Sequence, residues 1–292
     1  MTLRSLIAGI GGYLPERVLD NPALARAHGL DTTDEWIVER TGIRRRHIAA
    51  PGETASAMGA AAARAALAHA GLPAAAGALV VVATATPDSA FPATAVRIQG
   101  ALGIARGFAF DVSAACTGFI YALGIADSLI RTGQARCALV IGTEIYSRIL
   151  DWTDRGTCVL FGDGAGAVVL AATEAKDGRG ILSTHLHSDG RHGDILQVEG
   201  GAGSTGGAGL LRMAGKEVFR HAVSKLAAVV DEALAANGLG HEDVRWLVPH
   251  QANRRIIDAM GRKLKLPPER VVVTVDRHAN TSAASIPLAL AD

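Results

Sequence analysis

Short apolar runs alternate with stretches of helical periodicity along the whole chain, and this alternation constrains the fold more than any other feature. Runs such as 79–85 (LVVVATA) are apolar enough for buried strands. Between them lie helical patterns, for example Ala55–Ala70, which ends at Gly71, a residue suited to a helix C-cap. Strands that alternate with helices form mostly parallel sheets with helical crossovers. We therefore expect an α/β fold.

The same patterns locate the remaining elements. Strands are expected at 138–141, 167–170, 181–188, 246–248 and 271–275, and helices at 117–130, 217–236, 252–264 and from residue 282. The pattern restarts after a polar stretch near residue 175, which predicts two halves, 1–175 and 176–292.

Composition excludes several classes of protein. The chain has 292 residues, 49% of them hydrophobic, and a formal net charge of +1, which argues against disorder and against nucleic acid as a partner. Its three cysteines form no CxxC pair, so a disulfide scaffold and a metal centre are not expected. We find no signal peptide and no apolar run near the ~20 residues that a membrane helix needs. These features predict a cytoplasmic protein without membrane contact.

Two glycine-rich segments resemble nucleotide-binding loops only superficially. No Gly-Lys-Ser/Thr follows Gly200–Gly209, so this segment is not a P-loop. Phe161–Gly166 (FGDGAG) leads into a strand, whereas a dinucleotide-binding turn opens a helix. We therefore predict no nucleotide cofactor.

Three polar residues share one position in the pattern, between a predicted strand and the helix that follows it. They are Cys116, His250 and Asn280. The carboxyl ends of parallel strands are where α/β proteins build sites. A thiol at a helix N-terminus faces unpaired N–H groups, which are expected to lower its pKa and to hold an oxyanion. The alternatives are a buried structural cysteine, a surface histidine and an asparagine helix cap.

The segments around these residues resemble β-ketoacyl-acyl-carrier-protein synthase III, a family of the thiolase superfamily. The resemblance lies in DVSAACTGF, VPHQANRRI and RHANTSAASIP, and it extends to DEWIVERTGIRRRHIA, ATPDSAFPATA, DRGTCVLFGDGAGAVVL and MAGKEVFRHAV. It implies a thiolase-like duplicated fold of five layers, α-β-α-β-α. Members of this family continue beyond the position equivalent to residue 292, so the second half is expected to lack its last strands and to leave an apolar edge exposed.

The resemblance also implies the reaction and its partners. Cys116 would take an acyl group from a short acyl-CoA, with acetyl-CoA as the first expectation. Malonyl-acyl-carrier protein would then lose CO2 and attack the acyl-cysteine, with His250 and Asn280 stabilising the enolate. The family works without a cofactor, since the CoA thioester is a substrate, and a homodimer is expected.

Further site residues follow from the resemblance alone. Trp36 and Arg40 would enclose the CoA adenine, with Thr32 and Arg155 nearby, while Asn253 would guide the pantetheine arm and Phe219 line the acyl tunnel. Phe91 would reach across the dimer interface. The residues expected to meet an acidic carrier protein are Gln251, Ala252, Asn253, Arg254 and Arg255. The alternative for these residues is ordinary packing or a solvated charged face.

Other functions share parts of this pattern. A papain-like hydrolase also uses Cys, His and Asn in this order, but its CG[SA]C[WY] signature is absent. Elongating synthases and thiolases place a second His or Cys where this chain has Asn280, and type III polyketide synthases use CoA-bound extenders. A related synthase of specialised metabolism is the main alternative. A scaffold without activity would be expected to have lost part of the triad.

Overall fold

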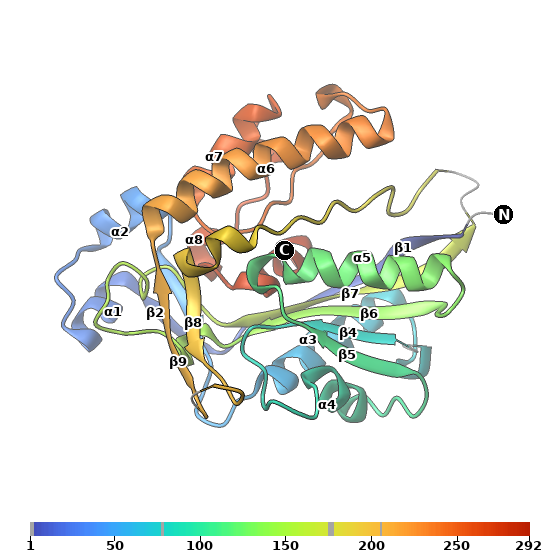
Figure 1. The fold of residues 1–292 in the computed structure, drawn as a ribbon, viewed down its shortest axis with the longest axis horizontal. Coiled ribbons are helices and arrows are strands. Elements are labelled where there is room, and N and C mark those ends of the chain that lie inside the picture. The colour runs from blue at the N-terminus through green and yellow to red at the C-terminus, as the bar shows by residue number, and fades with distance from the viewer. Residues whose placement is uncertain (1–2, 77–78, 175–177, 205) are drawn as a thin grey trace.

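A five-stranded mixed sheet forms the centre of the fold (Figure 1). The computed structural model describes residues 3–76, 79–174, 178–204 and 206–292. The strands lie in the order β1-β7-β6-β4-β5, and their bounds are β1 Leu3–Tyr13, β4 Leu79–Ala83, β5 Phe108–Val112, β6 Cys137–Glu144 and β7 Gly164–Glu174. β4 is parallel to β5 and β6, whereas β7 is antiparallel to both β6 and β1. β1, β4, β5 and β6 thus run in one direction, as the alternating pattern predicts. β7 is the exception, because the 145–163 connection contains no α-helix and returns the chain antiparallel.

Helices cover both faces of this sheet. α3 (Ala55–Ala70) and α4 (Thr94–Ala101) pack on one face, and α5 (Gly118–Arg131) and α9 (Ser285–Ala291) on the other. Alternate residues of β4 serve the two cores: Val80 and Val82 face α3, and Leu79 and Val81 face α5. α3 ends as predicted, with Gly71 in the left-handed conformation.

Two small two-stranded sheets and two short helices contribute to a third core beside the main sheet. β2 (Arg17–Asp20) pairs with β3 (Arg45–Ile48), and α1 (Asn21–His28) and α2 (Asp34–Thr41) lie between them in sequence. β8 (Leu196–Gly200) pairs with β9 (Ala208–Met213). The core is shared by buried side chains from both halves of the chain, among them Leu24, Ile37, Phe161, Leu211 and Ile257.

The predicted strands of the second half do not form a sheet. Leu247 and Val271 make one isolated parallel bridge, residues 181–188 run without a β-ladder, and Val275 begins the short helix α8 (Val275–His278). The predictions of strands at 181–188, 246–248 and 271–275 are therefore wrong, because a strand needs a paired neighbour and these segments find only that single bridge. α6 (Gly215–Asn237) and α7 (Arg254–Lys263) agree with the predicted helices.

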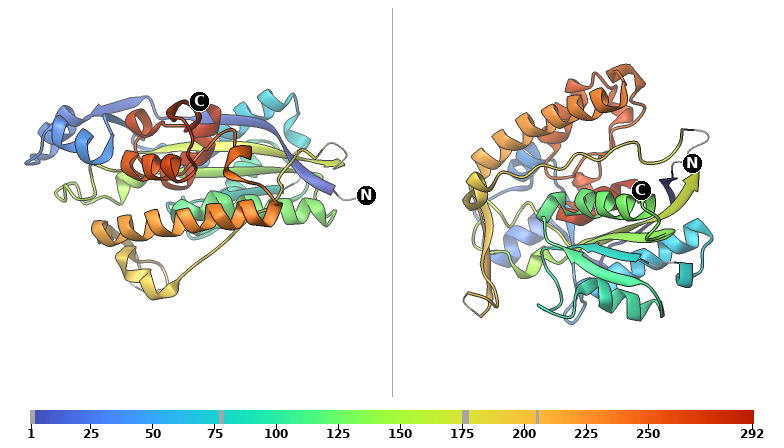
Figure 2. Two further views of the ribbon diagram at one scale, coloured as in Figure 1. Left: turned by 90° about the horizontal axis from the view of Figure 1, so that it is seen from above. Right: turned by 45° about the vertical axis from the view of Figure 1, so that its right-hand side comes forward.

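The 181–188 segment nevertheless occupies the place of a second β layer. On one side, Tyr121 and Arg131 of α5 donate hydrogen bonds to backbone carbonyls of residues 181–187. On the other side, Glu232 of α6 contacts both His185 and His187. Figures 1 and 2 show this segment between α5 and α6. The layer order is thus thiolase-like, but the second β layer is incomplete, and α6 has no fully buried residue.

The two predicted halves share packing contacts, because a helix of the second half lies on the sheet of the first half. α9, near the end of the chain, packs on β1 and β7, and a Cβ atom on Gly166 would lie only 2.7 Å from the backbone nitrogen of Leu288. The predicted junction at residue 175 lies outside the described residues. Within the described ranges, no helix is both long and apolar enough to cross a membrane.

Candidate active site

The carboxyl ends of the three hydrogen-bonded parallel strands β4, β5 and β6 lie side by side at one end of the sheet, and polar side chains are concentrated there. Cys116 lies in a 3-10 turn, Ala115–Thr117, between β5 and α5. Glu144 is the last residue of β6, and Thr84 and Thr86 follow β4. Ala115 has φ of 44°, an uncommon value for a residue with a side chain, at the position directly before the thiol.

The segment from Asn280 to Ser285 lies against this edge. Asn280 forms a parallel bridge with Phe161, and its Oδ1 accepts a hydrogen bond of 2.9 Å from the Ser282 N–H. Gly142 of β6 allows the approach, since a Cβ atom there would lie 2.2 Å from the Ala283 carbonyl oxygen. The 282–284 turn packs against the 115–117 turn that carries Cys116, and the Ser282 hydroxyl is buried without a hydrogen-bond partner among the described residues. Among the hydrogen bonds of the described residues, the Asn280 Nδ2 group makes none, so it remains available to a ligand.

His250 is attached to the same segment. Its Nδ1 atom lies 2.5 Å from the Ser285 hydroxyl oxygen. Burial lowers the pKa of His250 to about 4, so the ring is neutral near pH 7. Its Nε2 atom has no hydrogen-bond partner in the described part of the chain. The segment 280–285 therefore brings together the three residues that the sequence predicts as a triad: it contains Asn280, packs against the turn that carries Cys116, and is hydrogen-bonded to His250 through Ser285.

The thiol differs from its predicted state. Burial raises the pKa of Cys116 to about 11; the Ser282 hydroxyl opposes this rise, and the Glu144 carboxyl adds to it. The prediction of a lowered thiol pKa at a helix N-terminus is thus wrong, because the loss of solvation outweighs the favourable N–H groups.

Glu144 is a site residue that the sequence reasoning missed. Its side chain is fully buried, and its Oε2 accepts hydrogen bonds from the Ala85 N–H at 3.0 Å and the Thr86 hydroxyl at 2.9 Å. Burial raises the pKa of Glu144 to about 7. The sequence contains one feature that could have identified it: a carboxylate ends the mostly apolar strand CALVIGTE, at the end of the sheet where Cys116 is expected.

The residues predicted to bind adenine lie together on α2, on the loop before it and on the 151–157 loop, with Arg40 and Arg155 exposed and Trp36 and Thr32 half-buried. The guanidinium carbons of Arg40 and Arg155 lie 4.4 and 5.1 Å from the centre of the Trp36 ring. Arg155 also bonds the carbonyl of Asp31, and the neighbouring Thr32 has a buried hydroxyl without a protein partner among the described residues. Because Arg40 and Arg155 both lie over the Trp36 ring, a flat ligand can stack on this ring only if one arginine moves away or if the ligand and an arginine occupy the same face of the ring together.

The residues around α7 divide into inward and outward sets. Gln251 is fully buried, and its amide makes four hydrogen bonds, two from Nε2 and two to Oε1. It therefore has no surface for a carrier protein, contrary to the prediction. Asn253 caps α7 through the Arg255 N–H and donates to the Arg40 carbonyl, and Ala252 is half-buried beside it.

Arg254 and Arg255 are exposed on the outer face of α7. Arg254 pairs with Asp258 at 2.7 Å, and the Arg255 guanidinium carbon lies 5.3 Å from the centre of the half-buried Phe219 ring. The remaining cations of this face, Arg262, Lys263 and Lys265, are also exposed. Phe219 thus lies close to this basic face.

Phe91 projects from the protein surface. It is 86% exposed in the loop before α4, and Val96 of α4 and Phe108 of β5 are exposed apolar residues from the neighbouring elements. β5 is the edge strand of the sheet, and Asp111 of β5 caps α4 through the Thr94 and Ala95 N–H groups.

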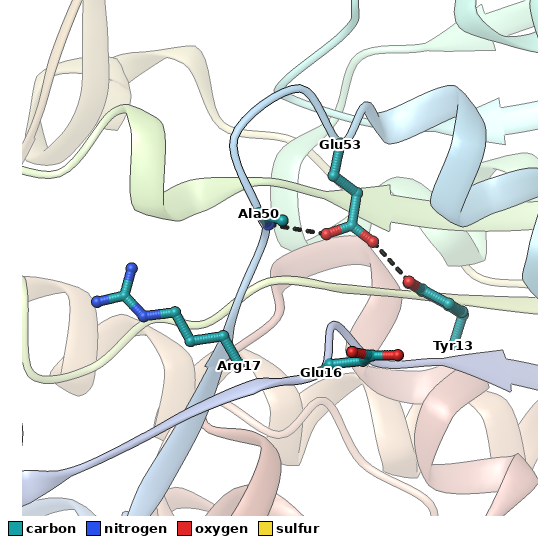
Figure 3. A pocket seen from close by; sticks show the side chains of 5 residues that line it. All are labelled: Tyr13, Glu16, Arg17, Ala50 and Glu53. Atoms are coloured by element: carbon teal, nitrogen blue, oxygen red, sulfur yellow. Dashed lines mark hydrogen bonds between the residues drawn. The ribbon is translucent and has the colours of Figure 1, made fainter.

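A surface recess lies elsewhere. It has a volume of about 420 Å³ and is lined by Tyr13, Glu16, Arg17, Ala50 and Glu53 (Figure 3). The Tyr13 hydroxyl donates to Glu53 at 2.6 Å, and this bond raises the pKa of Tyr13 to about 12. None of these residues belongs to the predicted site. The described residues contain no group of three His, Cys, Asp or Glu side chains placed to hold a metal ion.

Comparison with known proteins identifies close relatives. Family models described as 3-oxoacyl-(acyl-carrier-protein) synthase III and its C-terminal part match residues 110–190 and 234–292. The chain is 66% identical to the β-ketoacyl-(acyl-carrier-protein) synthase III of Acidiphilium cryptum, over 98% of this chain and 89% of the relative. It is also 66% identical to the enzyme of the same name from Rhodospirillum centenum, over 100% and 90%.

Solved structures agree with these relatives. The 3-oxoacyl-(acyl-carrier-protein) synthase III of Aquifex aeolicus matches 98% of this chain and 89% of its own, with a TM-score of 0.91 and 46% identity. A priming β-ketosynthase from a polyketide biosynthetic pathway matches 98% and 86%, with a TM-score of 0.90 and 40% identity.

Proposed function

Because the chain belongs to the 3-oxoacyl-(acyl-carrier-protein) synthase III family and is an acyltransferase of the thiolase fold, we propose that it condenses a short acyl-CoA, acetyl-CoA first of all, with malonyl-acyl-carrier protein. The products are 3-oxoacyl-acyl-carrier protein, CoA and CO2, and the step initiates fatty acid synthesis. The supporting observation is the segment 280–285, which contains Asn280, packs against the turn that carries Cys116 and is hydrogen-bonded to His250 through Ser285. It leaves His250 Nε2 and Asn280 Nδ2 unpartnered within the described residues.

In the first stage, the Cys116 sulfur attacks the acyl-CoA thioester. The bond between the acyl carbon and the CoA sulfur breaks, CoA leaves as a thiolate, and the thiol proton is passed to solvent. Since the thiol has a raised pKa, loss of this proton is a large part of the barrier to acylation.

In the second stage, the malonyl group loses CO2, and the electron pair of the broken C–C bond moves to the thioester oxygen. His250 Nε2–H and the Asn280 Nδ2 group donate hydrogen bonds to this oxygen. The enolate carbon then attacks the acyl-cysteine, a C–C bond forms, and the Cys116 sulfur leaves with its electron pair. A neutral His250, as its lowered pKa implies, suits a donor that must carry one proton on Nε2.

We assign the two substrates to two different regions of the surface. We assign adenine binding to Trp36, Arg40, Arg155 and Thr32, and pantetheine and acyl contacts to Asn253 and Phe219. The basic face of α7, which begins with Arg254 and Arg255, fits an acidic carrier protein together with Ala252 in the preceding loop, and this docking should weaken with salt. No cofactor takes part, and the proposed location is the cytoplasm.

The apolar surface at the sheet edge fits a second copy of the chain. Phe91, Val96 and Phe108 expose apolar area on the loop, helix and edge strand that adjoin one another. A homodimer through this edge would cover them and pair the open side of β5.

A radiochemical assay tests the proposal. Malonyl-acyl-carrier protein with a labelled carboxylate should release labelled CO2, and release should require acetyl-CoA and Cys116. The variants His250→Ala and Asn280→Ala should still acylate Cys116 but should release CO2 at least about 100-fold more slowly. Peptide hydrolysis without CO2 release would refute the proposal. A strong preference for octanoyl- over acetyl-CoA would favour a synthase of specialised metabolism, which the polyketide-pathway neighbour makes the second candidate.

A further inference from the structure

The hydrogen bonds of Ser285 determine which nitrogen of His250 carries the proton. Ser285 is the first residue of α9, and its side chain is 1% exposed. Its hydroxyl oxygen lies 2.5 Å from His250 Nδ1 and 3.3 Å from the backbone nitrogen of Gln251. These are the hydrogen bonds that the structure gives this hydroxyl within the described residues.

Counting protons leaves one satisfactory arrangement. The Gln251 N–H can only donate, so the Ser285 oxygen accepts there, and the hydroxyl still has one proton to donate. If His250 Nδ1 carried a proton, the Nδ1–H and the Gln251 N–H would both donate to the Ser285 oxygen. The Ser285 hydroxyl proton would then be buried without an acceptor. If the Ser285 hydroxyl donates to Nδ1, every one of these groups is satisfied, and the single proton of the neutral ring lies on Nε2.

We infer that Ser285 is a positioning residue for this enzyme: its hydroxyl, held by the Gln251 N–H, donates to His250 Nδ1 and thereby keeps the ring in the tautomer that presents N–H from Nε2 to the substrate. This inference rests on the proposed role of His250 as a donor to the enolate oxygen. In the other tautomer, Nε2 would be an acceptor and would repel that oxygen.

The surroundings of Ser285 are rigid enough for this task. Gln251 is fixed at its side chain by Pro249 and Val272 on one side and by Thr274 and Val275 on the other. Since the buried Gln251 amide holds the backbone at this point, the Gln251 N–H is kept in place to orient the hydroxyl. The buried Gln251 side chain thus has a role in the site, because its four hydrogen bonds hold the backbone N–H that contacts Ser285.

Nitrogen-15 NMR of the histidine rings tests the inference directly on the 292-residue chain. In the wild-type protein near pH 7, the His250 signal, identified by its loss in His250→Gln, should show a protonated Nε2 and an unprotonated Nδ1 that accepts a hydrogen bond. In Ser285→Ala, the Nδ1 signal should move toward that of a free acceptor. A protonated Nδ1 in the wild-type protein would overturn the inference, whether or not the chain catalyses condensation.

Kinetics separate positioning from folding. Ser285→Ala should lower the rate of malonyl decarboxylation about tenfold, which matches the loss of one hydrogen bond, while acylation of Cys116 by acetyl-CoA stays unchanged. Ser285→Thr keeps the hydroxyl and should recover the decarboxylation rate. Ser5→Ala, which deletes another fully buried hydroxyl far from the site on β1, is the matched control. Equal losses in both stages, or no recovery with threonine in a folded protein, would refute the positioning role.

Discussion

The buried carboxyl of Glu144 should make the stability of this protein fall as the pH rises. Its side chain is fully buried, and burial raises its pKa from 4.5 to about 7 despite the hydrogen bonds from Ala85 and Thr86. The folded state therefore favours the protonated form. The stabilising contribution is complete below the unfolded pKa of 4.5 and is lost as the pH rises through about 7.

The size of the effect follows from the two pKa values. At roughly 1.4 kcal/mol per pH unit, the difference between 4.5 and about 7 corresponds to about 3 kcal/mol of the free energy of unfolding. Glu144→Gln replaces the carboxyl with a neutral group of the same shape that retains an acceptor for the Ala85 N–H. The variant should therefore gain about 3 kcal/mol relative to the wild type between about pH 5 and pH 8.

Urea unfolding at fixed protein concentration, followed by tryptophan fluorescence, measures this gain at each pH. Only the difference between variant and wild type is compared, since the titration of all other groups then cancels. The exposed Glu199→Gln is the control, because it removes a carboxylate from the surface and should give a flat difference. A flat difference for Glu144→Gln as well would refute the reasoning that burial controls this carboxyl.

Three further predictions concern the substrates and the assembly. Trp36→Ala should raise the KM for acetyl-CoA about tenfold with little change in kcat, as expected for a lost stacking surface; Trp246→Ala, an exposed tryptophan outside the cluster, is the control, and an unchanged KM would contradict the assignment. The rate of Cys116 acylation should rise about tenfold per pH unit from about pH 7 to pH 9, because the thiol pKa is about 11; rapid-quench mass spectrometry would reveal a plateau below about pH 8, which would be inconsistent with this thiol. Phe108→Asp should convert a dimer to monomers in analytical ultracentrifugation, whereas Leu239→Asp, an exposed apolar residue elsewhere, should not; dissociation by both or by neither would argue against the β5 edge.

The sequence is most informative where the signal is local. The helix Ala55–Ala70 and its end at Gly71 are predictable because helical periodicity and a left-handed cap depend on neighbouring residues. The strand-to-helix transition at Cys116 is also local, because β5 ends shortly before the thiol and α5 begins shortly after it. His250 is marked by its pattern as well, although only the helix α7 of the two predicted elements around it forms.

Features that depend on distant partners are not predictable in this way. Residues 271–275 have the composition of a strand, but they lack a paired neighbour apart from the bridge to Leu247. The burial of a polar side chain is not visible in a local pattern. It raises the pKa of Cys116, and it places Gln251 inside the protein although its neighbours in sequence are exposed or half-buried. Ser285 contacts His250 across 35 positions of sequence, so its role is visible only in three dimensions.

Peptide mapping by mass spectrometry tests the central claim, condensation through an acyl-cysteine, most directly. After incubation with acetyl-CoA, one acetyl group should be found on the peptide that contains Cys116, and it should disappear when malonyl-acyl-carrier protein is added, as 3-oxobutyryl-acyl-carrier protein forms. An acetyl group on Cys137 or Cys158, or one on Cys116 that persists with malonyl-acyl-carrier protein present, would contradict this account.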